Sequence, residues 1–197
     1  MGILKDLTKE YFGEKVRKED DINIDGLEVD IVSFTDKNGN YHGRGYKPKD
    51  LYNLIKLLER MVEVRGDEGD FNDIDTSEIE SMMMLFYYNE TFNGDISGWD
   101  VSSVVNMRSM FCEAKSFNQD ISNWTFPNVT NMSNMFDNAK SFNQPIGNWK
   151  FPNVKDMRFM FWGATSFNQD LSNWDLTGID KNDIFKDCPI KDEFKPK

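Results

Sequence analysis

Few residues of this chain have the types and spacing that catalysis or metal binding requires. The sequence contains a single histidine, His42, so we expect neither a histidine-rich metal site nor a histidine-dependent catalytic triad. The segment Asp21-Ile22-Asn23-Ile24-Asp25-Gly26 begins like a calcium-binding loop. Val32 stands where that loop needs a bidentate glutamate. The sequence therefore predicts a protein that is not an enzyme and has no cofactor and no bound metal.

The two cysteines, Cys112 and Cys188, are too few for a disulfide framework and lie far apart in the chain. Reduced, buried thiols are the expected state of both.

Charge is distributed unevenly along the 197 residues, whose formal net charge is -11. Residues 1–65 contain 12 Lys/Arg and 13 Asp/Glu, whereas residues 66–197 contain 11 Lys/Arg and 21 Asp/Glu. An acidic surface repels phosphate backbones, so we expect a basic protein partner and no direct binding of nucleic acid. The composition does not indicate an oligomeric state.

The chain has neither an apolar run of the ~20 residues that a membrane span needs nor the start of a signal peptide. We therefore expect no membrane association and a cytoplasmic location, with an extracellular role only by an unconventional route.

A period of 25 residues dominates the second part of the sequence. Trp99, Trp124, Trp149 and Trp174 follow one another at this step. Other residue types keep the same step: Met107, Met132, Met157; Met110, Met135, Met160; Phe111, Phe136, Phe161; Ala114, Ala139, Ala164; Phe117, Phe142, Phe167. Such a period indicates stacked structural units that share one core.

The spacing inside one unit suggests its secondary structure. Met107, Met110, Phe111 and Ala114 recur at three and four residues, which is typical of one face of a short helix. The segment 117–124 suits a short strand. We therefore predict the α/β fold class: a short leucine-rich-repeat-like solenoid with one strand and one short helix per 25-residue coil. Asn93, Asn118, Asn143 and Asn168 should satisfy backbone groups between coils.

The motif from Trp99-Asp100-Val101-Ser102 to Phe117-Asn118-Gln119-Asp120-Ile121-Ser122, with its two successors, resembles the BspA-like leucine-rich repeat of the mycoplasma-lipoprotein type. The resemblance covers about residues 71–190. It implies a curved solenoid used for protein recognition, in a family whose members are often secreted or surface-anchored adhesins. Unsecreted proteins that resemble this one occur among phage and other mobile-element proteins.

The first 69 residues have a different composition and are predicted to form an α-β-β-α module. Apolar residues from Ile3 to Tyr11 mark a first helix, two strands follow, and Lys47-Pro48-Lys49-Asp50 opens a helix whose apolar residues include Leu51, Leu54, Leu58 and Met61. We interpret this module as a cap on the first coil rather than as a free-standing domain. The predicted organisation is the module at 1–69, a solenoid of about four coils with a C-terminal cap at 70–190, and a tail at 191–197.

The leading functional hypothesis is a protein-binding module that presents an acidic, polar, concave strip. Its candidate residues share equivalent positions in the coils: Asp95, Ser97, Asp120, Ser122, Asn123, Gln144, Asp170 and Ser172. Trp162 occupies the position of Cys112 and Asp137, outside the Met and Phe rows, and an exposed indole there would be a binding hot spot. One alternative is a phage or mobile-element inhibitor whose acidic surface competes with nucleic acid for a host complex. A second alternative is a surface adhesin-like protein.

Overall fold

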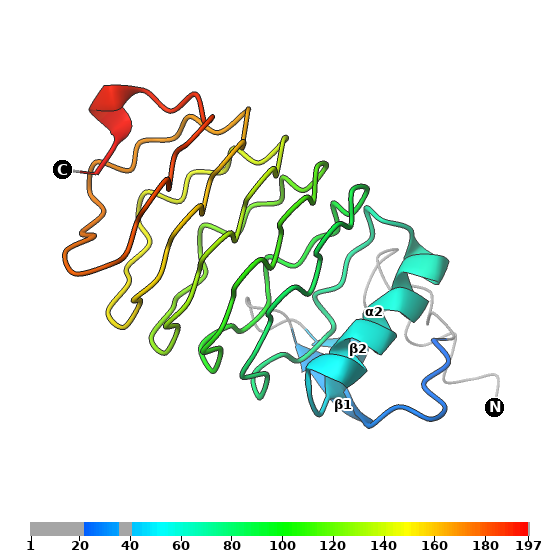
Figure 1. The fold of residues 1–197 in the computed structure, drawn as a ribbon. Coiled ribbons are helices and arrows are strands. Elements are labelled where there is room, and N and C mark those ends of the chain that lie inside the picture. The colour runs from blue at the N-terminus through cyan, green and yellow to red at the C-terminus, as the bar shows by residue number, and fades with distance from the viewer. Residues whose placement is uncertain (1–21, 36–40, 197) are drawn as a thin grey trace, which may run out of the picture.

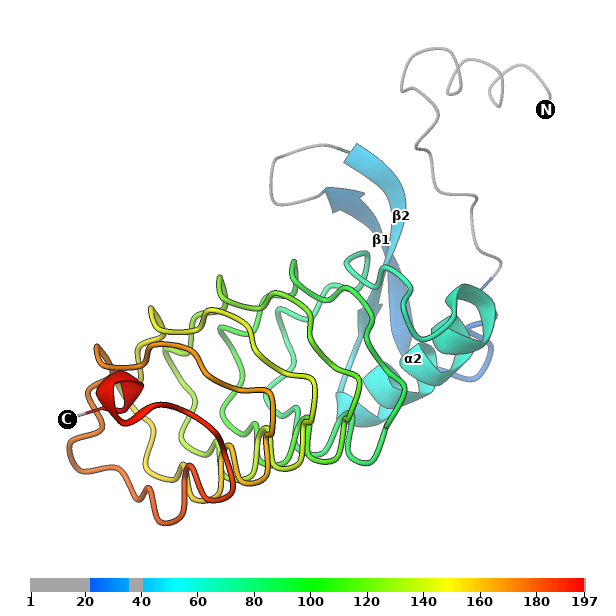
Figure 2. The same cartoon turned by 90° about the horizontal axis from the view of Figure 1, so that it is seen from above.

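The computed structural model describes residues 22–35 and 41–196 (Figure 1). The predicted first helix falls on residues 1–21 and lies outside this described part. Strand β1 (Val29–Thr35) pairs antiparallel with strand β2 (Tyr41–Pro48), and helix α2 (Leu51–Arg65) follows. A short 3-10 helix, η1 (Asp192–Phe194), lies near the C-terminus. The hairpin and helix α2 lie at one end of the molecule and η1 lies at the other (Figure 2).

Helix α2 begins where the sequence predicts it. The Asp50 side chain accepts a hydrogen bond from the Asn53 backbone amide at 2.8 Å, as an N-cap residue should. The helix ends at Gly66, which takes a φ of 78° and donates its backbone N–H to Val62. Leu54, Leu57 and Met61 are fully buried. The helix therefore packs its apolar face into the core.

A backbone bridge and a buried ion pair help to join the hairpin and helix to the rest of the chain. Tyr46 of β2 forms a parallel bridge with Ile74, in which it donates to the Asp73 carbonyl and accepts from the Asp75 amide, both at 2.8 Å. The Arg65 guanidinium donates to both carboxylate oxygens of Asp73, at 2.7 and 2.8 Å. Both side chains of this ion pair are nearly inaccessible to solvent.

From residue 70 onward the chain passes repeatedly around one core, and its successive passages lie side by side (Figure 1). We call each passage a rung. Isolated parallel bridges join the rungs in one row: Ser81 to Asn106, Asn106 to Asn131, Asn131 to Asp156, and Asp156 to Asp180. Alternate backbone amides in each rung donate to carbonyls of the next, as Met107 does to Asn131 and Ser109 to Ser133, both at 2.9 Å.

The predicted fold class is wrong. In the described chain between Gly66 and Lys191 there is no α-helix and no regular strand; the α-helix and the two antiparallel strands all lie before residue 66, and the 3-10 helix η1 lies after Lys191. The segment predicted to be helical, 107–114, contains Ser109 at φ 55° and Glu113 at φ 60°, and a right-handed helix does not accommodate that conformation. Amides that would bond along a helix bond to the next rung instead, so the leucine-rich-repeat-like coil of strand plus helix is not formed.

The residues predicted to point inward are nevertheless buried. Successive tight turns, each closed by a hydrogen bond between residues three apart, bring side chains to one side at nearly the same spacing as a helix. Met110, Cys112 and Ala114 each donate a backbone N–H to the carbonyl three residues earlier, at 3.1–3.2 Å. These turns place Met107, Met110, Phe111 and Ala114 in the core at 0% exposure. The predicted residues thus form the core, although the backbone that carries them is not the predicted helix.

Aromatic rings form columns through the core. Phe86, Phe111, Phe136, Phe161 and Phe185 follow one another with ring centroids 5.4, 5.5, 5.5 and 5.7 Å apart. The indole N–H groups of Trp99, Trp149 and Trp174 donate to carbonyls of the preceding rung, at 3.0–3.3 Å. The columns hold neighbouring rungs in register.

The predicted asparagine row is confirmed. The side-chain carbonyls of Asn93, Asn118 and Asn143 accept hydrogen bonds from the backbone amides of the asparagines that follow 25 residues later, at 2.9–3.0 Å. Lys191 continues the row by donating to Asn168 at 3.1 Å. On this side of the molecule, hydrogen bonds from asparagine side chains therefore join neighbouring rungs, where the sequence predicted a strand.

Candidate protein-interaction site

One corner of each rung carries two polar positions, five residues apart, that are mostly aspartates. We call these positions the acidic corner. From the first rung to the last they are Asp70 and Asp75, Asp95 and Asp100, Asp120 and Thr125, Pro145 and Lys150, and Asp170 and Asp175. Between the two positions a tight turn buries two apolar side chains, as Ile121 and Trp124 show. The corner is acidic in every rung except the one with Pro145 and Lys150.

The backbone fixes the carboxylates of the corner. Asp95, Asp120 and Asp170 each accept the backbone N–H of the serine two residues later at 2.9 Å. Hydrogen bonds from the Ser172 side chain and backbone hold the pKa of Asp170 below its ordinary value, and the Thr177 backbone does the same for Asp175. Asp170 and Asp175 therefore present ordered, ionised carboxylates at neutral pH.

The structure places all the predicted strip residues except Trp162 on this corner or next to it. Asp120, Asn123 and Asp170 are exposed, and the other residues of the strip are half-buried: Asp95, Ser97, Ser122, Gln144 and Ser172. Two of the amides have structural partners, since the Asn123 side chain donates to the Ser97 carbonyl and the Gln144 side chain donates to the Asn118 carbonyl. The exposed aspartates are thus the members most available to a partner.

Sequence reasoning missed the second position of the corner. Asp75, Asp100 and Asp175 keep the same 25-residue step, and the last two directly follow the row tryptophans Trp99 and Trp174. That repetition was the signal that could have found them.

Trp162 lies in a different environment. Its indole N–H donates to the Asp187 carboxylate at 2.9 Å, the Lys186 ammonium lies 5.1 Å from the ring centroid, and the Phe159 ring lies 5.5 Å away. The side chain is half-buried. The indole of Trp162 therefore packs against neighbouring side chains and does not belong to the acidic corner.

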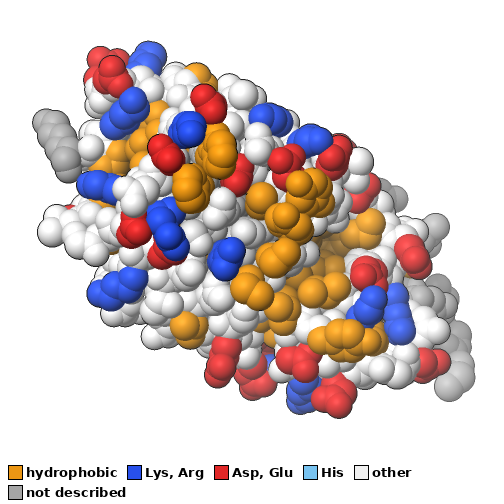
Figure 3. All heavy atoms as spheres, viewed as in Figure 1, with side chains coloured by type: hydrophobic (Ala, Val, Ile, Leu, Met, Phe, Trp, Pro, Cys, Tyr) orange, Lys and Arg blue, Asp and Glu red, His pale blue; other side chains and the backbone are white. Residues whose placement is uncertain are grey.

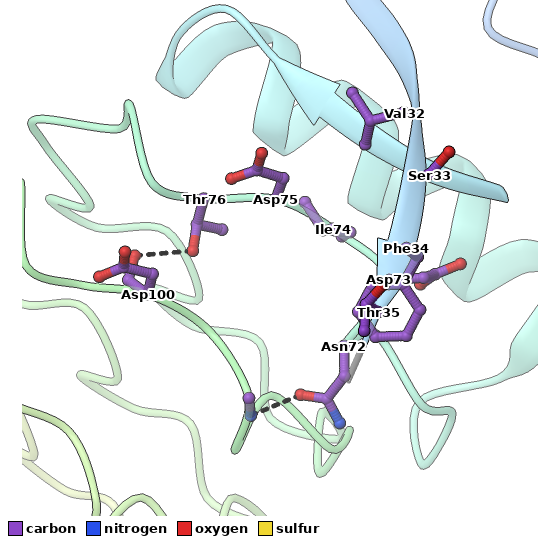
Figure 4. A pocket seen from close by; sticks show the side chains of 11 residues that line it. Val32, Ser33, Phe34, Thr35, Asn72, Asp73, Ile74, Asp75, Thr76 and Asp100 are labelled. Carbon is purple, nitrogen blue, oxygen red and sulfur yellow. Dashed lines mark hydrogen bonds between the residues drawn. The ribbon is translucent and has the colours of Figure 1, made fainter. Parts of the chain in front are cut away.

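A pocket of about 280 Å³ lies between strand β1 and the first rungs (Figure 4). Val32, Phe34 and Ile74 supply apolar wall, and Asp75 and Asp100 of the acidic corner supply carboxylates. Burial opposes ionisation of Asp75, but hydrogen bonds from Ser77 and the Lys47 charge outweigh it and lower its pKa. An aliphatic stem that carries a cation suits such a lining.

Both cysteines are free thiols, Cys112 buried and Cys188 half-buried. Burial raises the pKa of the Cys112 thiol to about 12, with smaller contributions from the carboxylates of Asp137 and Glu113. We predict that iodoacetamide at pH 8 alkylates native Cys112 roughly a hundredfold or more slowly than the same thiol in denaturant, because the thiolate is the nucleophile. Mass spectrometry of timed digests measures both rates. Equal rates would contradict the burial of this side chain.

Within residues 22–35 and 41–196 no group of three or more His, Cys, Asp or Glu side chains has the arrangement of a metal site. The helices of the described chain include none with the length and hydropathy of a membrane span.

A family model described as "Mycoplasma protein of unknown function, DUF285" matches residues 56–174 and 110–191. No curated protein and no solved structure matches the sequence.

Proposed function

The chain belongs to this family of mycoplasma-type proteins of unknown function, and from that premise we propose that it is a non-enzymatic module that binds a basic protein through the acidic corner. The observation that carries the proposal is the recurrence of ordered carboxylates at one corner of successive rungs. Asp120 and Asp170 are exposed there, and each uses one oxygen on its own turn. Their exposed carboxylates would meet the lysine or arginine side chains of the partner.

The recurrence also specifies the partner. Carboxylates that repeat from rung to rung match cationic side chains that repeat along a partner segment. The pocket beside Asp75 and Asp100 would take one of those side chains, with the stem against Val32 and Phe34. The single cation of the corner, Lys150, divides the acidic positions into two groups.

The test neutralises the corner without removing its hydrogen bonds. Asparagine keeps the side-chain oxygen that accepts the serine N–H, so Asp95→Asn, Asp120→Asn and Asp170→Asn remove charge and preserve the turns. Calorimetry with a Lys/Arg-rich peptide as the probe should show binding by the native protein that weakens as salt rises. The triple variant should bind roughly three- to 150-fold more weakly, since each of the three exposed ion pairs contributes about 0.2–1 kcal/mol.

The matched control neutralises three exposed carboxylates elsewhere, with Glu63→Gln, Glu68→Gln and Glu193→Gln. It changes the net charge equally and should leave peptide affinity within twofold. If both triple variants lose the same affinity, net charge and not the corner is responsible, and the proposal fails.

A further inference from the structure

Exposed apolar side chains lie both on the rungs and on strand β1. Figure 3 shows those of the rungs, gathered in a patch that extends toward the end with helix α2. On strand β1, the side chain of Ile31 is 48% exposed. Apolar side chains alone do not specify what covers them, but strand β1 also presents backbone groups, which do.

The backbone groups along the outer edge of β1 have no partner in the described chain. Tyr46 of β2 uses its N–H and C=O in the bridge to the first rung. In an antiparallel pair, the backbone groups of two directly opposite residues point either toward each other or away from each other. Ile31 lies opposite Tyr46, so its N–H and C=O point away from β2. The same alternation turns the groups of Val29 and Ser33 outward, and no described group bonds to them. We call Val29, Ile31 and Ser33 the open edge.

The open edge is suited to pairing with another strand. Exposed edges of natural sheets are usually guarded by a proline, a bulge or a covering segment. The register of β1 with β2 is regular from Val29 to Phe34, and its irregularity lies after Phe34. This stretch contains no proline and includes three β-branched residues, which favour strand pairing. Asp30, Ile31 and Ser33 are exposed.

One face of β1 turns toward the acidic corner. Val32 and Phe34 on this face line the pocket that Asp75 and Asp100 also line (Figure 4). The Lys47 ammonium lies 3.6 Å from the Asp75 carboxylate and partly neutralises it, whereas Asp100 is exposed. Side chains of an added strand that lie on this face extend toward these carboxylates. Lysine or arginine suits that place, with an aliphatic stem against the apolar wall.

The opposite face of β1 suits apolar side chains. Ile31 lies there beside Tyr46. The Arg44 guanidinium lies 5.1 Å from the centroid of the Tyr46 ring, and it repels a further cation. Successive side chains of a strand point to opposite faces. The two faces together therefore predict a segment in which cationic and apolar residues alternate.

We propose that the basic partner contributes an extended segment of alternating cationic and apolar residues, which pairs as a third strand with the open edge of β1. The segment belongs to the basic protein that the proposed function requires, so its binding rests on that function. Backbone hydrogen bonds to Val29, Ile31 and Ser33 supply affinity, and the cations that reach the pocket supply the preference for a basic sequence. The sheet then continues from the first rung through β2 and β1 to the partner.

Ile31→Pro tests the open edge without changing any charge. The N–H of Ile31 points away from β2, so proline removes an outward donor, places its ring on the edge and leaves the hydrogen bonds of the hairpin intact. Ile31→Ala is the matched control, because it shortens the same side chain but keeps the N–H. In calorimetry with an eight-residue peptide of alternating lysine and valine, Ile31→Pro should bind roughly tenfold or more weakly than Ile31→Ala, since backbone hydrogen bonds are lost.

Two methylated forms of the peptide test the same contact with the native protein, because a folding defect in Ile31→Pro would also lower affinity. One form carries N-methyl groups on its valines and the other on its lysines, so each blocks one edge of the extended peptide. Only the form whose blocked edge faces β1 should lose affinity.

The outcomes separate the added strand from the acidic corner. Equal affinities of the two methylated forms would overturn the added strand, and so would a native protein that does not bind the unmethylated peptide. Loss of affinity in the triple variant of the acidic corner, with equal binding by Ile31→Pro and Ile31→Ala, would uphold the corner and reject the strand.

Discussion

Replacing Phe136 with alanine is expected to lower the free energy of unfolding by about 3–5 kcal/mol. The side chain is fully buried in the middle of the stacked rungs. Its ring stacks on Phe142 at 4.0 Å, and on Phe111 and Phe161 at 5.5 Å each. Removal therefore leaves a cavity between three rungs that the flanking aromatic columns cannot close.

Denaturant unfolding followed by tryptophan fluorescence measures this loss. Phe151→Ala is the matched control, because Phe151 is half-buried and packs against Trp149 and Trp174 at the side of the core. It should cost about 1–2 kcal/mol, in proportion to the smaller apolar area that it buries. A loss at Phe136 no larger than the loss at Phe151 would show that the aromatic column is not the centre of the core.

Replacing Arg65 with methionine is expected to cost a similar amount, about 3–5 kcal/mol, for an electrostatic reason. Side-chain exposure is 8% for Arg65 and 5% for Asp73, so the substitution takes a bidentate cation from a carboxylate that water cannot reach. The pair fastens the end of helix α2 to the first rung. Detachment of the helix would expose Leu54, Leu57 and Met61.

A double-mutant cycle isolates the contribution of the pair. Arg65→Met with Asp73→Leu should recover most of the stability lost in Arg65→Met, since an apolar pair of similar volume does not bury an uncompensated charge. Lys56→Met, which removes the exposed partner of Glu59, should cost about 0–1 kcal/mol. Hydrogen exchange of the α2 amides should accelerate in Arg65→Met alone. Unchanged exchange and stability would show that the pair does not fasten the helix.

The core was predictable from sequence, whereas the backbone that forms it was not. Spacings of three and four residues arise both in a helix and in successive tight turns, so the positions of Met110 and Phe111 do not distinguish the two. The distinguishing residues lie in another row. Tyr88, Glu113, Asn138, Gly163 and Asp187 all take a positive φ. Asn, Gly and Asp in one row are the residues that tolerate this conformation best, and they are the signal against a helix.

The candidate site was predictable in part, for a similar reason. The Asp-x-Ser pattern at Asp95, Asp120 and Asp170 repeats and can be found by alignment of the rungs. The row of Asp75 and Asp100 meets strand β1 only in three dimensions, because Tyr46 pairs with Ile74. No local pattern places the hairpin there, so the pocket between them needed the structure.

The rows of the rungs also determine how the chain can change in length. A segment of 25 residues inserted between two rungs would restore every row, including the bond between Asn118 and Asn143. A single residue inserted in the middle would misalign every later row. The final bridge joins Asp156 to Asp180 across 24 residues, and a one-residue deletion is tolerated there because residues 188–196 do not form a further rung. Gene duplication in units of one rung is thus the route by which such a protein can lengthen, with irregular lengths confined to its last rung.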